Sequence, residues 1–316
     1  MNIEESESKI RILINHAWDR EVDWPAIEQW LGNFDGYIHD ADSEKSHCLL
    51  ALSRFMYFGK RLVREMLKSL YRDHIRAPMR QRIRRNFDDT RNIDLIDAAY
   101  EQELSSTRFI GVGNPSESGA HLLYYFRQVN ALPKDLFSDL ASIISTSVKN
   151  GDVAIRVKGS GIRRLVFFDD LVGSGDQVTG YLAEHLRRIK KTDPDIDVRF
   201  MSLFATEEGL EKLNRPTMFD GNAFSLFELD ESYKAFSNES RYFFGAPEWF
   251  SKDIMRDIAR GYGIRLLPSS PLGHRNNQLL IGFSHNTPDN VPPIFWADRL
   301  DLPWYPAFLR YHKNYG

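Results

Sequence analysis

The sequence predicts an α/β protein: a parallel-sheet domain preceded by an α-helical region. From about residue 107 onward, short apolar runs alternate with amphipathic segments of about 10 to 15 residues, as in βαβ units. Residues 165–168, LVFF, are apolar at every position, which a parallel strand buried on both faces requires. Residues 1–105 instead carry apolar side chains at helical spacing. We therefore expect a helical N-terminal region at 1–105 and an α/β domain with a C-terminal extension at 106–316.

Composition narrows the class of protein. The chain has 316 residues, a formal net charge of −3 and one cysteine, Cys48. One cysteine cannot form a disulfide framework, and the charge does not mark the whole chain as a nucleic-acid binder. The start of the chain is acidic and lacks the pattern of a signal peptide, and no run approaches the ~18 apolar residues of a membrane span. A cytoplasmic protein without membrane contact is expected.

The α/β part divides into predicted elements by its periodicity and its glycines. Strands are expected at 108–112, 153–157, 164–168, 197–205, 222–229 and 278–283. Helices are expected at 118–130, 133–150, 174–191, 206–214 and 247–260.

Two acids and a glycine-rich loop follow the apolar run. Asp169 and Asp170 are placed at the carboxyl end of the strand, the edge where open parallel sheets bind ligands. Gly173 and Gly175 permit positive φ and close approach of a ligand to the backbone. The next helix begins near Ser174, and its free amides favour a phosphate. Acids for sugar hydroxyls beside amides for a phosphate predict a ribose-phosphate site.

The stretch LVFFDDLVGSGDQ resembles the signature of type I phosphoribosyltransferases, in which two acids and three variable residues precede Thr-Gly-x-Thr. The resemblance implies that Asp169 and Asp170 hold the ribose hydroxyls of phosphoribosyl pyrophosphate or a nucleotide, and that they contact magnesium. It implies a catalytic role for this acid pair in glycosyl transfer. Gln177 stands where the family has its last threonine. The implied phosphate contacts are Gly173, Ser174, Gly175, Asp176 and Gln177.

An earlier strand-loop-helix segment, FIGVGNPSESGAHLLYYFR, resembles the pyrophosphate loop of the same family. The resemblance implies pyrophosphate contacts at Asn114, Ser116, Glu117, Ser118 and Gly119. Simple capping of the following helix by Ser116 or Ser118 is the alternative. The family also has a mobile hood loop before the acid-pair strand, for which only residues 158–164 are left here.

Most of the chain is similar to the phosphoribosyltransferase-like proteins of prokaryotic conflict and defence systems. The segments DDLVGSGDQ, GNPSESG and PLGHRNNQLLIGFSHNTPDNVPPIFW carry this resemblance. It implies an effector or component of a bacterial antiphage defence system. Two alternatives stay open: a non-catalytic nucleotide sensor, and an interaction subunit that binds a protein or a nucleic acid.

The segment 76–92, RAPMRQRIRRNFDDTRN, is rich in arginine. Such a cluster is suited to nucleic acid or to an acidic protein partner. A solvated helix face explains it equally well. The candidate contacts are Arg80, Arg82, Arg84 and Arg85.

Overall fold

The computed structural model describes residues 3–113, 118–149, 152–159, 161–298 and 302–310. The chain forms two compact units. The central unit is Arg64–Glu228, and the terminal unit combines Met1–Val63 with Leu229–Gly316. Compact packing therefore divides the chain elsewhere than at the expected boundary between residues 105 and 106.

A four-stranded sheet forms the core of the central unit, in the order β2-β5-β6-β7. Its strands are Thr107–Gly111 (β2), Arg164–Val172 (β5), Asp197–Thr206 (β6) and Ala223–Leu229 (β7). β5 pairs in parallel with both neighbours, so that Phe167 lies opposite Ile110 of β2 and Phe200 of β6. Helices α9 (Asp176–Thr192) and α10 (Glu207–Leu213) connect β5 to β6 and β6 to β7. The predicted α/β class with a parallel sheet is confirmed.

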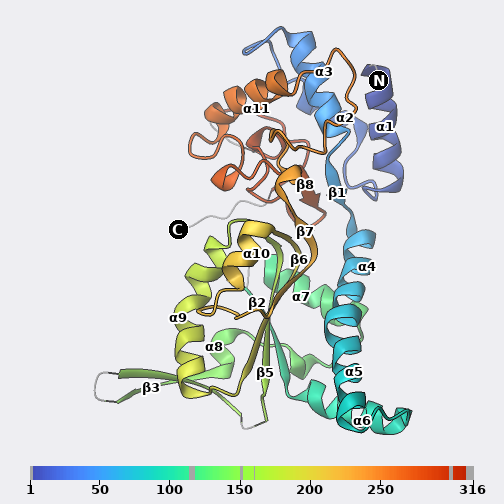
Figure 1. Cartoon of the computed structure of the whole chain (residues 1–316). Helices are drawn as coiled ribbons and strands as arrows, with labels where there is room; N and C mark the ends of the chain where they lie inside the picture. The colour runs from blue at the N-terminus through green and yellow to red at the C-terminus, as the bar shows by residue number, and fades with distance from the viewer. Residues whose placement is uncertain (1–2, 114–117, 150–151, 160, 299–301, 311–316) are drawn as a thin grey trace. The chain divides into compact units, whose positions relative to one another are not determined.

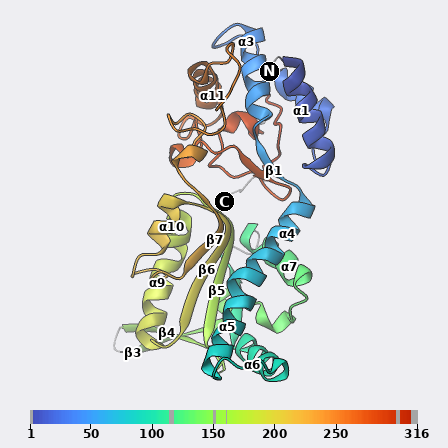
Figure 2. The same ribbon diagram turned by 45° about the vertical axis from the view of Figure 1, so that its right-hand side comes forward.

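Different helices cover the two faces of this sheet. α9 and α10 lie on one side, and α7 (Ser118–Val129) lies on the other (Figure 1 and Figure 2). Adjacent side chains of β5 serve both faces: the Phe167 ring centroid is 6.0 Å from that of Phe219, whereas the Phe168 centroid is 5.3 Å from that of Phe126 in α7. Burial on both faces explains why consecutive positions of β5 are apolar.

The segment before β5 does not form the helix predicted over 133–150. It contains a 3-10 turn, η2 (Lys134–Leu136), a short α8 (Leu140–Ile143) and the strand β3 (Ile144–Lys149), which pairs antiparallel with β4 (Asp152–Val157). Residues 144–148, ISTSV, are rich in β-branched side chains, which favour strands over helices.

The base of the β3–β4 hairpin is tied to the C-terminal end of α9. The Val157 N–H donates to Asp193 Oδ2 at 3.2 Å, and Asp193 directly follows α9. α9 has 17 residues, and at about 1.5 Å per residue its length is roughly 25 Å. The hairpin base and residues 173–177 therefore lie at opposite ends of one helix.

Helices from the predicted N-terminal region belong to the central unit wholly or, in the case of α4 (Lys60–Tyr71), from Arg64 onward. α4 continues through a π-helical turn, η1 (Arg72–Arg76), into α5 (Ala77–Asn86), and α6 (Ile93–Ser105) follows. Glu103 of α6 accepts a hydrogen bond of 2.8 Å from Arg164 at the start of β5. This bond joins α6 to the sheet, and ion pairs of Arg80 and Arg82 join α5 to α6. The compact unit begins at residue 64.

The terminal unit is built from both ends of the chain. Its first segment supplies α1 (Ile3–His16), α2 (Trp24–Leu31), α3 (Ala41–Leu52) and β1 (Met56–Phe58). Its second segment supplies η3 (Glu231–Tyr233), α11 (Lys252–Leu266), η4 (His274–Asn276), β8 (Ile281–Phe283) and η5 (Pro293–Phe295).

Two long-range contacts hold these segments together. β8, which was predicted as part of the α/β domain, pairs in parallel with β1 instead of joining the main sheet. The Trp30 indole of the first segment donates to the Ile294 carbonyl of the second at 2.7 Å. Within the second segment, the Trp304 indole donates to the same carbonyl at 3.1 Å. Among the described residues, none of the helices combines the length and apolar character that crossing a membrane would require.

Candidate functional site

Asp169 and Asp170, the acid pair, lie inside β5 and not just after it. β5 continues to Val172, whereas the ladder between β2 and β5 ends where Gly111 faces Phe168. The acid pair therefore begins where β2 stops and β6 still continues alongside. Only 5% of Asp169 and 6% of Asp170 is exposed. Two acidic side chains this deeply buried at the carboxyl edge of a parallel sheet are the centre of the candidate site.

Each carboxylate of the acid pair binds the backbone that follows it. Asp169 Oδ1 accepts a 2.9 Å hydrogen bond from the Asp170 N–H, and Asp170 Oδ1 accepts a 2.8 Å bond from the Leu171 N–H. These bonds orient both carboxylates before any ligand arrives. Because side chains alternate along a strand, the two acids leave β5 toward opposite faces of the sheet.

Residues 173–177, the glycine loop, connect β5 to α9. Gly175 is the N-cap residue of α9 and has φ 72°, in the left-handed region that glycine adopts without strain. Ser174 is buried, with 7% of its surface exposed. The loop therefore presents the start of a 17-residue helix directly after the acid pair, as the sequence predicted.

Helix α10 packs directly on the glycine loop. The Thr206 hydroxyl donates to the Gly173 carbonyl at 2.7 Å and accepts from the Gly209 N–H at 3.0 Å. A Cβ on Gly209 would lie 2.1 Å from the Gly173 carbonyl oxygen, so only glycine fits there. Close packing of backbone on backbone is thus one reason for the glycines, beside the approach of a ligand.

A charged contact connects the glycine loop with α10. Asp176 is in the first turn of α9, and it forms an ion pair with Lys212 of α10. Asp176 Oδ2 also accepts a 3.0 Å hydrogen bond from the Ser174 hydroxyl, which itself accepts from the Asp176 N–H at 3.3 Å. Lys212 was not among the candidate residues from the sequence. Nothing in its local sequence shows that α10 packs against the glycine loop.

Ser202 of β6 is a second residue that the sequence prediction missed. It lies opposite Asp169 in the β5–β6 register, and it is completely buried. Its hydroxyl has no hydrogen-bond partner among the described residues. A polar residue inside the apolar run FMSLFA was the available signal. Buried hydroxyls are normally paired, so Ser202 marks this edge of the sheet as incompletely satisfied.

Of the predicted pyrophosphate contacts, the structure places Gly119 beside the acid-pair strand. Gly119 is in the first turn of α7, where a Cβ would lie 2.9 Å from the Phe168 carbonyl oxygen and 3.0 Å from that of Val112. Ser118 begins α7. Asn114, Ser116 and Glu117 lie outside the described residues, so their predicted role remains a prediction.

The segment expected to supply a hood, residues 158–164, is remote from the glycine loop. It follows the β3–β4 hairpin, whose base is at the far end of α9. Arg163 lines a cavity of about 350 Å³ there, together with Asp193 and Asp195. Arg164 is part of the ion-pair network described below. Neither arginine is placed to close over the acid pair.

The four candidate arginines all lie on α5, and two of them are paired within the chain. Arg80 forms an ion pair with Asp97, and Arg82 forms one with Glu103. The Arg84 Nε donates to the Thr90 carbonyl at 3.2 Å, and Arg85 is exposed. The interaction surface predicted for α5 therefore includes two side chains that also join α5 to α6.

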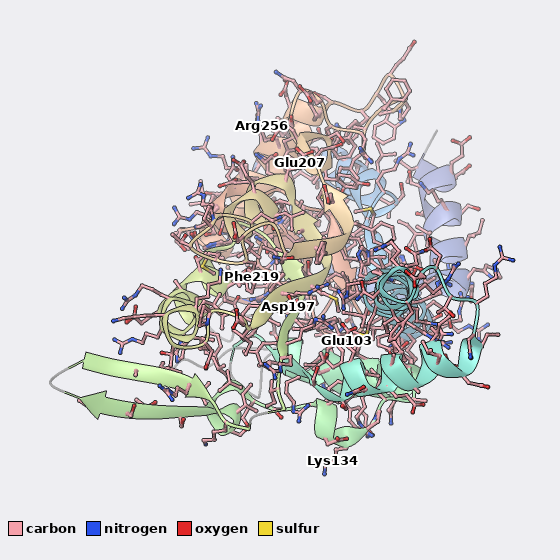
Figure 3. All side chains as sticks on the ribbon, turned by 60° about the horizontal axis from the view of Figure 1, so that its bottom comes forward. Glu103, Lys134, Asp197, Glu207, Phe219 and Arg256 are labelled. Carbon is pink, nitrogen blue, oxygen red and sulfur yellow. The ribbon has the colours of Figure 1, made fainter. Side chains whose placement is uncertain are left out.

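Arg82 is the outer member of a network at the amino edge of the sheet. Glu103 also bonds Arg164, which donates to Asp197 at 2.6 Å, and Asp197 pairs with Arg199 at 2.8 Å. Figure 3 shows Glu103 and Asp197 at this edge. Burial raises the pKa of Asp197, but the bonds from Arg199 and Arg164 outweigh burial and leave that pKa below its ordinary value.

The donor set at the carboxyl edge fits a hard cation such as magnesium. Asp169 and Asp170 supply carboxylate oxygens, the ligands that magnesium prefers. No group of three or more His, Cys, Asp or Glu side chains suited to a metal occurs in the part of the chain that the structure describes.

Comparison with known proteins identifies the class. The model of the PRTase-CE family matches residues 27–310, and the chain belongs to this family, a phosphoribosyltransferase family by its name. No curated protein matches the chain closely enough to count as a relative.

Similar solved structures include a xanthine-guanine-hypoxanthine phosphoribosyltransferase of Helicobacter pylori, with 13% identity over 62% of this chain and 90% of that one, at TM-score 0.28. A purine phosphoribosyltransferase of Pyrococcus horikoshii Ot3 has 12% identity over 49% and 80%, at TM-score 0.26. A hypothetical protein of Neisseria gonorrhoeae with bound ppGpp has 11% identity over 56% and 85%, at TM-score 0.32. At these scores the likeness carries no argument about the ligand of this chain.

Proposed function

We propose that this protein binds phosphoribosyl pyrophosphate or a nucleotide at the carboxyl edge of the central sheet. The acid pair accepts hydrogen bonds from the ribose hydroxyls, and the glycine loop receives a phosphate at the start of α9. The observation that carries the proposal is the buried acid pair directly before a loop that caps a helix, in a chain of the PRTase-CE family.

The chemistry suited to this site is glycosyl transfer at the anomeric carbon. Such a reaction develops positive charge on the sugar, so it needs oriented carboxylates more than a protein nucleophile. Asp169 and Asp170 are held by backbone amides, and this orientation costs nothing at the moment of reaction. Magnesium, when bound with the substrate, supplies charge neutralisation at the pyrophosphate. The loop at residues 114–119 is proposed as the pyrophosphate contact.

Calorimetry with phosphoribosyl pyrophosphate and AMP, each with magnesium, tests the proposal. Asp169→Asn with Asp170→Asn is expected to weaken binding at least tenfold, because charge-assisted bonds to the ribose become neutral. Asp195→Asn is the matched control, since Asp195 is exposed and lies beyond the other end of α9. Absence of binding by the unaltered protein to both ligands would refute the proposal.

Release of pyrophosphate separates an enzyme from a non-catalytic sensor. With phosphoribosyl pyrophosphate, magnesium and a panel of bases, turnover that disappears in the acid-pair variant indicates a transferase. Tight binding without turnover for any base favours the sensor.

The defence role is the wider part of the proposal, and the sequence resemblance to proteins of conflict systems supports it. Plaque counts on a bacterial host that carries the gene, with and without the acid-pair substitutions, test it. If the substitutions leave protection unchanged, the ribose site is not the source of protection. Protection lost on Arg84→Glu with Arg85→Glu would favour the interaction subunit, because these two arginines are exposed.

A further inference from the structure

We propose that Asp176 competes with the phosphate of a ligand for Lys212 and for the Ser174 hydroxyl, so that the glycine loop is self-inhibited toward anions. The inference rests on the proposed function and concerns the regulation of the same site.

Asp176 already uses the polar groups that would attract a phosphate. Its Oδ1 pairs with Lys212, and its Oδ2 accepts the Ser174 hydroxyl at 3.0 Å. The Asp176 N–H donates to Ser174 Oγ at 3.3 Å. The Lys212 ammonium and the Ser174 hydroxyl are thus both engaged with the Asp176 carboxylate, and the Asp176 amide is engaged with the Ser174 hydroxyl.

The charges of this arrangement disfavour the binding of a phosphate. A carboxylate in the first turn of a helix is stabilised by the helix dipole, as a bound phosphate would be. Lys212 and Asp176 together carry no net charge, so the pair adds no attraction for an incoming anion. A phosphate has to compete with Asp176 for the positive charge of Lys212, and the nearby carboxylate repels the phosphate.

The lysine is able to exchange partners. Its side chain is 27% exposed, and the Asp176 side chain is 36% exposed. The Lys212 stem runs beside Gly175, where its Cδ would lie 3.4 Å from an added Cβ. The ammonium therefore sits next to the N-cap of α9, and a small rotation of a flexible chain redirects it.

Binding of AMP and adenosine to the whole protein tests the proposal, because the two ligands differ only in the 5′-phosphate. Asp176→Asn keeps the shape of the side chain and removes its charge. We expect the ratio of AMP affinity to adenosine affinity to rise about five- to tenfold, and to rise less at high salt. Adding Lys212→Met to this variant should remove the gain. Asp195→Asn, exposed beyond the far end of α9, should leave the ratio unchanged.

The outcomes separate the two proposals. If AMP binds and Asp176→Asn leaves the ratio unchanged or lowers it, the competition is refuted while the ribose site stands. If the gain persists after Lys212→Met, the released lysine is not its cause and the proposal also fails. If phosphoribosyl pyrophosphate, AMP and adenosine all fail to bind both the unaltered protein and the variant, the proposed function fails, and this inference with it.

Discussion

The amino edge and the carboxyl edge of the central sheet both carry buried charged side chains, but they hold them differently. At the amino edge, Arg164 bonds Glu103 and Asp197, so charges of opposite sign satisfy one another. At the carboxyl edge, Asp169 and Asp170 accept hydrogen bonds from neighbouring backbone amides. There, the hydroxyl of Ser202 stays without a partner among the described residues.

The amino edge is arranged to stabilise the fold, whereas the carboxyl edge is the proposed ligand site. Mutual ion pairs across α6, β5 and β6 hold these elements together, and removing Arg164 breaks the connection between the Arg82–Glu103 pair and the Asp197–Arg199 pair. On the proposed function, the carboxylates at the carboxyl edge are oriented by the backbone for a ligand. Such an arrangement exchanges some stability for function.

The largest effect is expected from Arg164→Met at the amino edge. Arg164 is 7% exposed and bridges two carboxylates. Removing one partner of buried ion pairs costs about 3–5 kcal/mol, so urea unfolding should show a loss of this order in the free energy of unfolding. Arg187→Met, on the exposed face of α9, should cost far less. Equal losses in the two variants would mean that the network does not stabilise the sheet.

Gly209→Ala tests the close packing of α10 against the glycine loop. The added methyl would meet the Gly173 carbonyl oxygen at 2.1 Å, so the backbone must shift. Overpacking of this kind costs about 1–3 kcal/mol, measured by urea unfolding. Gly180→Ala in the exposed face of α9 meets no atom within 4 Å and should stabilise the protein, as alanine does in helices. If Gly209→Ala does not lower the free energy of unfolding relative to Gly180→Ala, the close packing is contradicted.

Ser202→Ala should have the opposite sign to Arg164→Met. Removing a buried hydroxyl without a partner is expected to raise the free energy of unfolding by about 1–2 kcal/mol. Ser225→Ala in β7 is the control, because the Ser225 hydroxyl donates to the Phe227 carbonyl at 2.9 Å and its loss should destabilise. If both variants lose stability in urea, Ser202 has a partner and the contrast between the edges is weaker than described.

The smallest effect is the pH dependence that comes from Asp197. Its folded-state pKa is below the ordinary value, so its ion pairs stabilise the fold above the unfolded-state pKa of about 3.9. That stability is lost as the pH falls through the folded-state pKa. The free energy of unfolding should drop as the pH falls below about 5, and that of Asp197→Asn should drop less over the same range. The same slope in both proteins would assign the acid sensitivity to other groups.

Much of the central unit could be predicted from local pattern. The strands at 164–168 and 197–205 and the helix at 174–191 correspond to β5, β6 and α9, because their apolar spacing matches their burial. The helix predicted over 133–150 was wrong, because only η2 and the short α8 are helical there and the β-branched residues that follow form β3. The candidate acids and glycines were found because they are adjacent in sequence.

The sequence by itself determined the alternation of strands and helices and the adjacency of the acid pair to the glycine loop, since both depend on neighbouring residues. Only the tertiary structure decided that β8 joins β1, that Ser202 lies opposite Asp169, and that Lys212 meets Asp176. The physical reason is distance along the chain. Such contacts form when separate elements pack, and no local periodicity records which residues will then face one another.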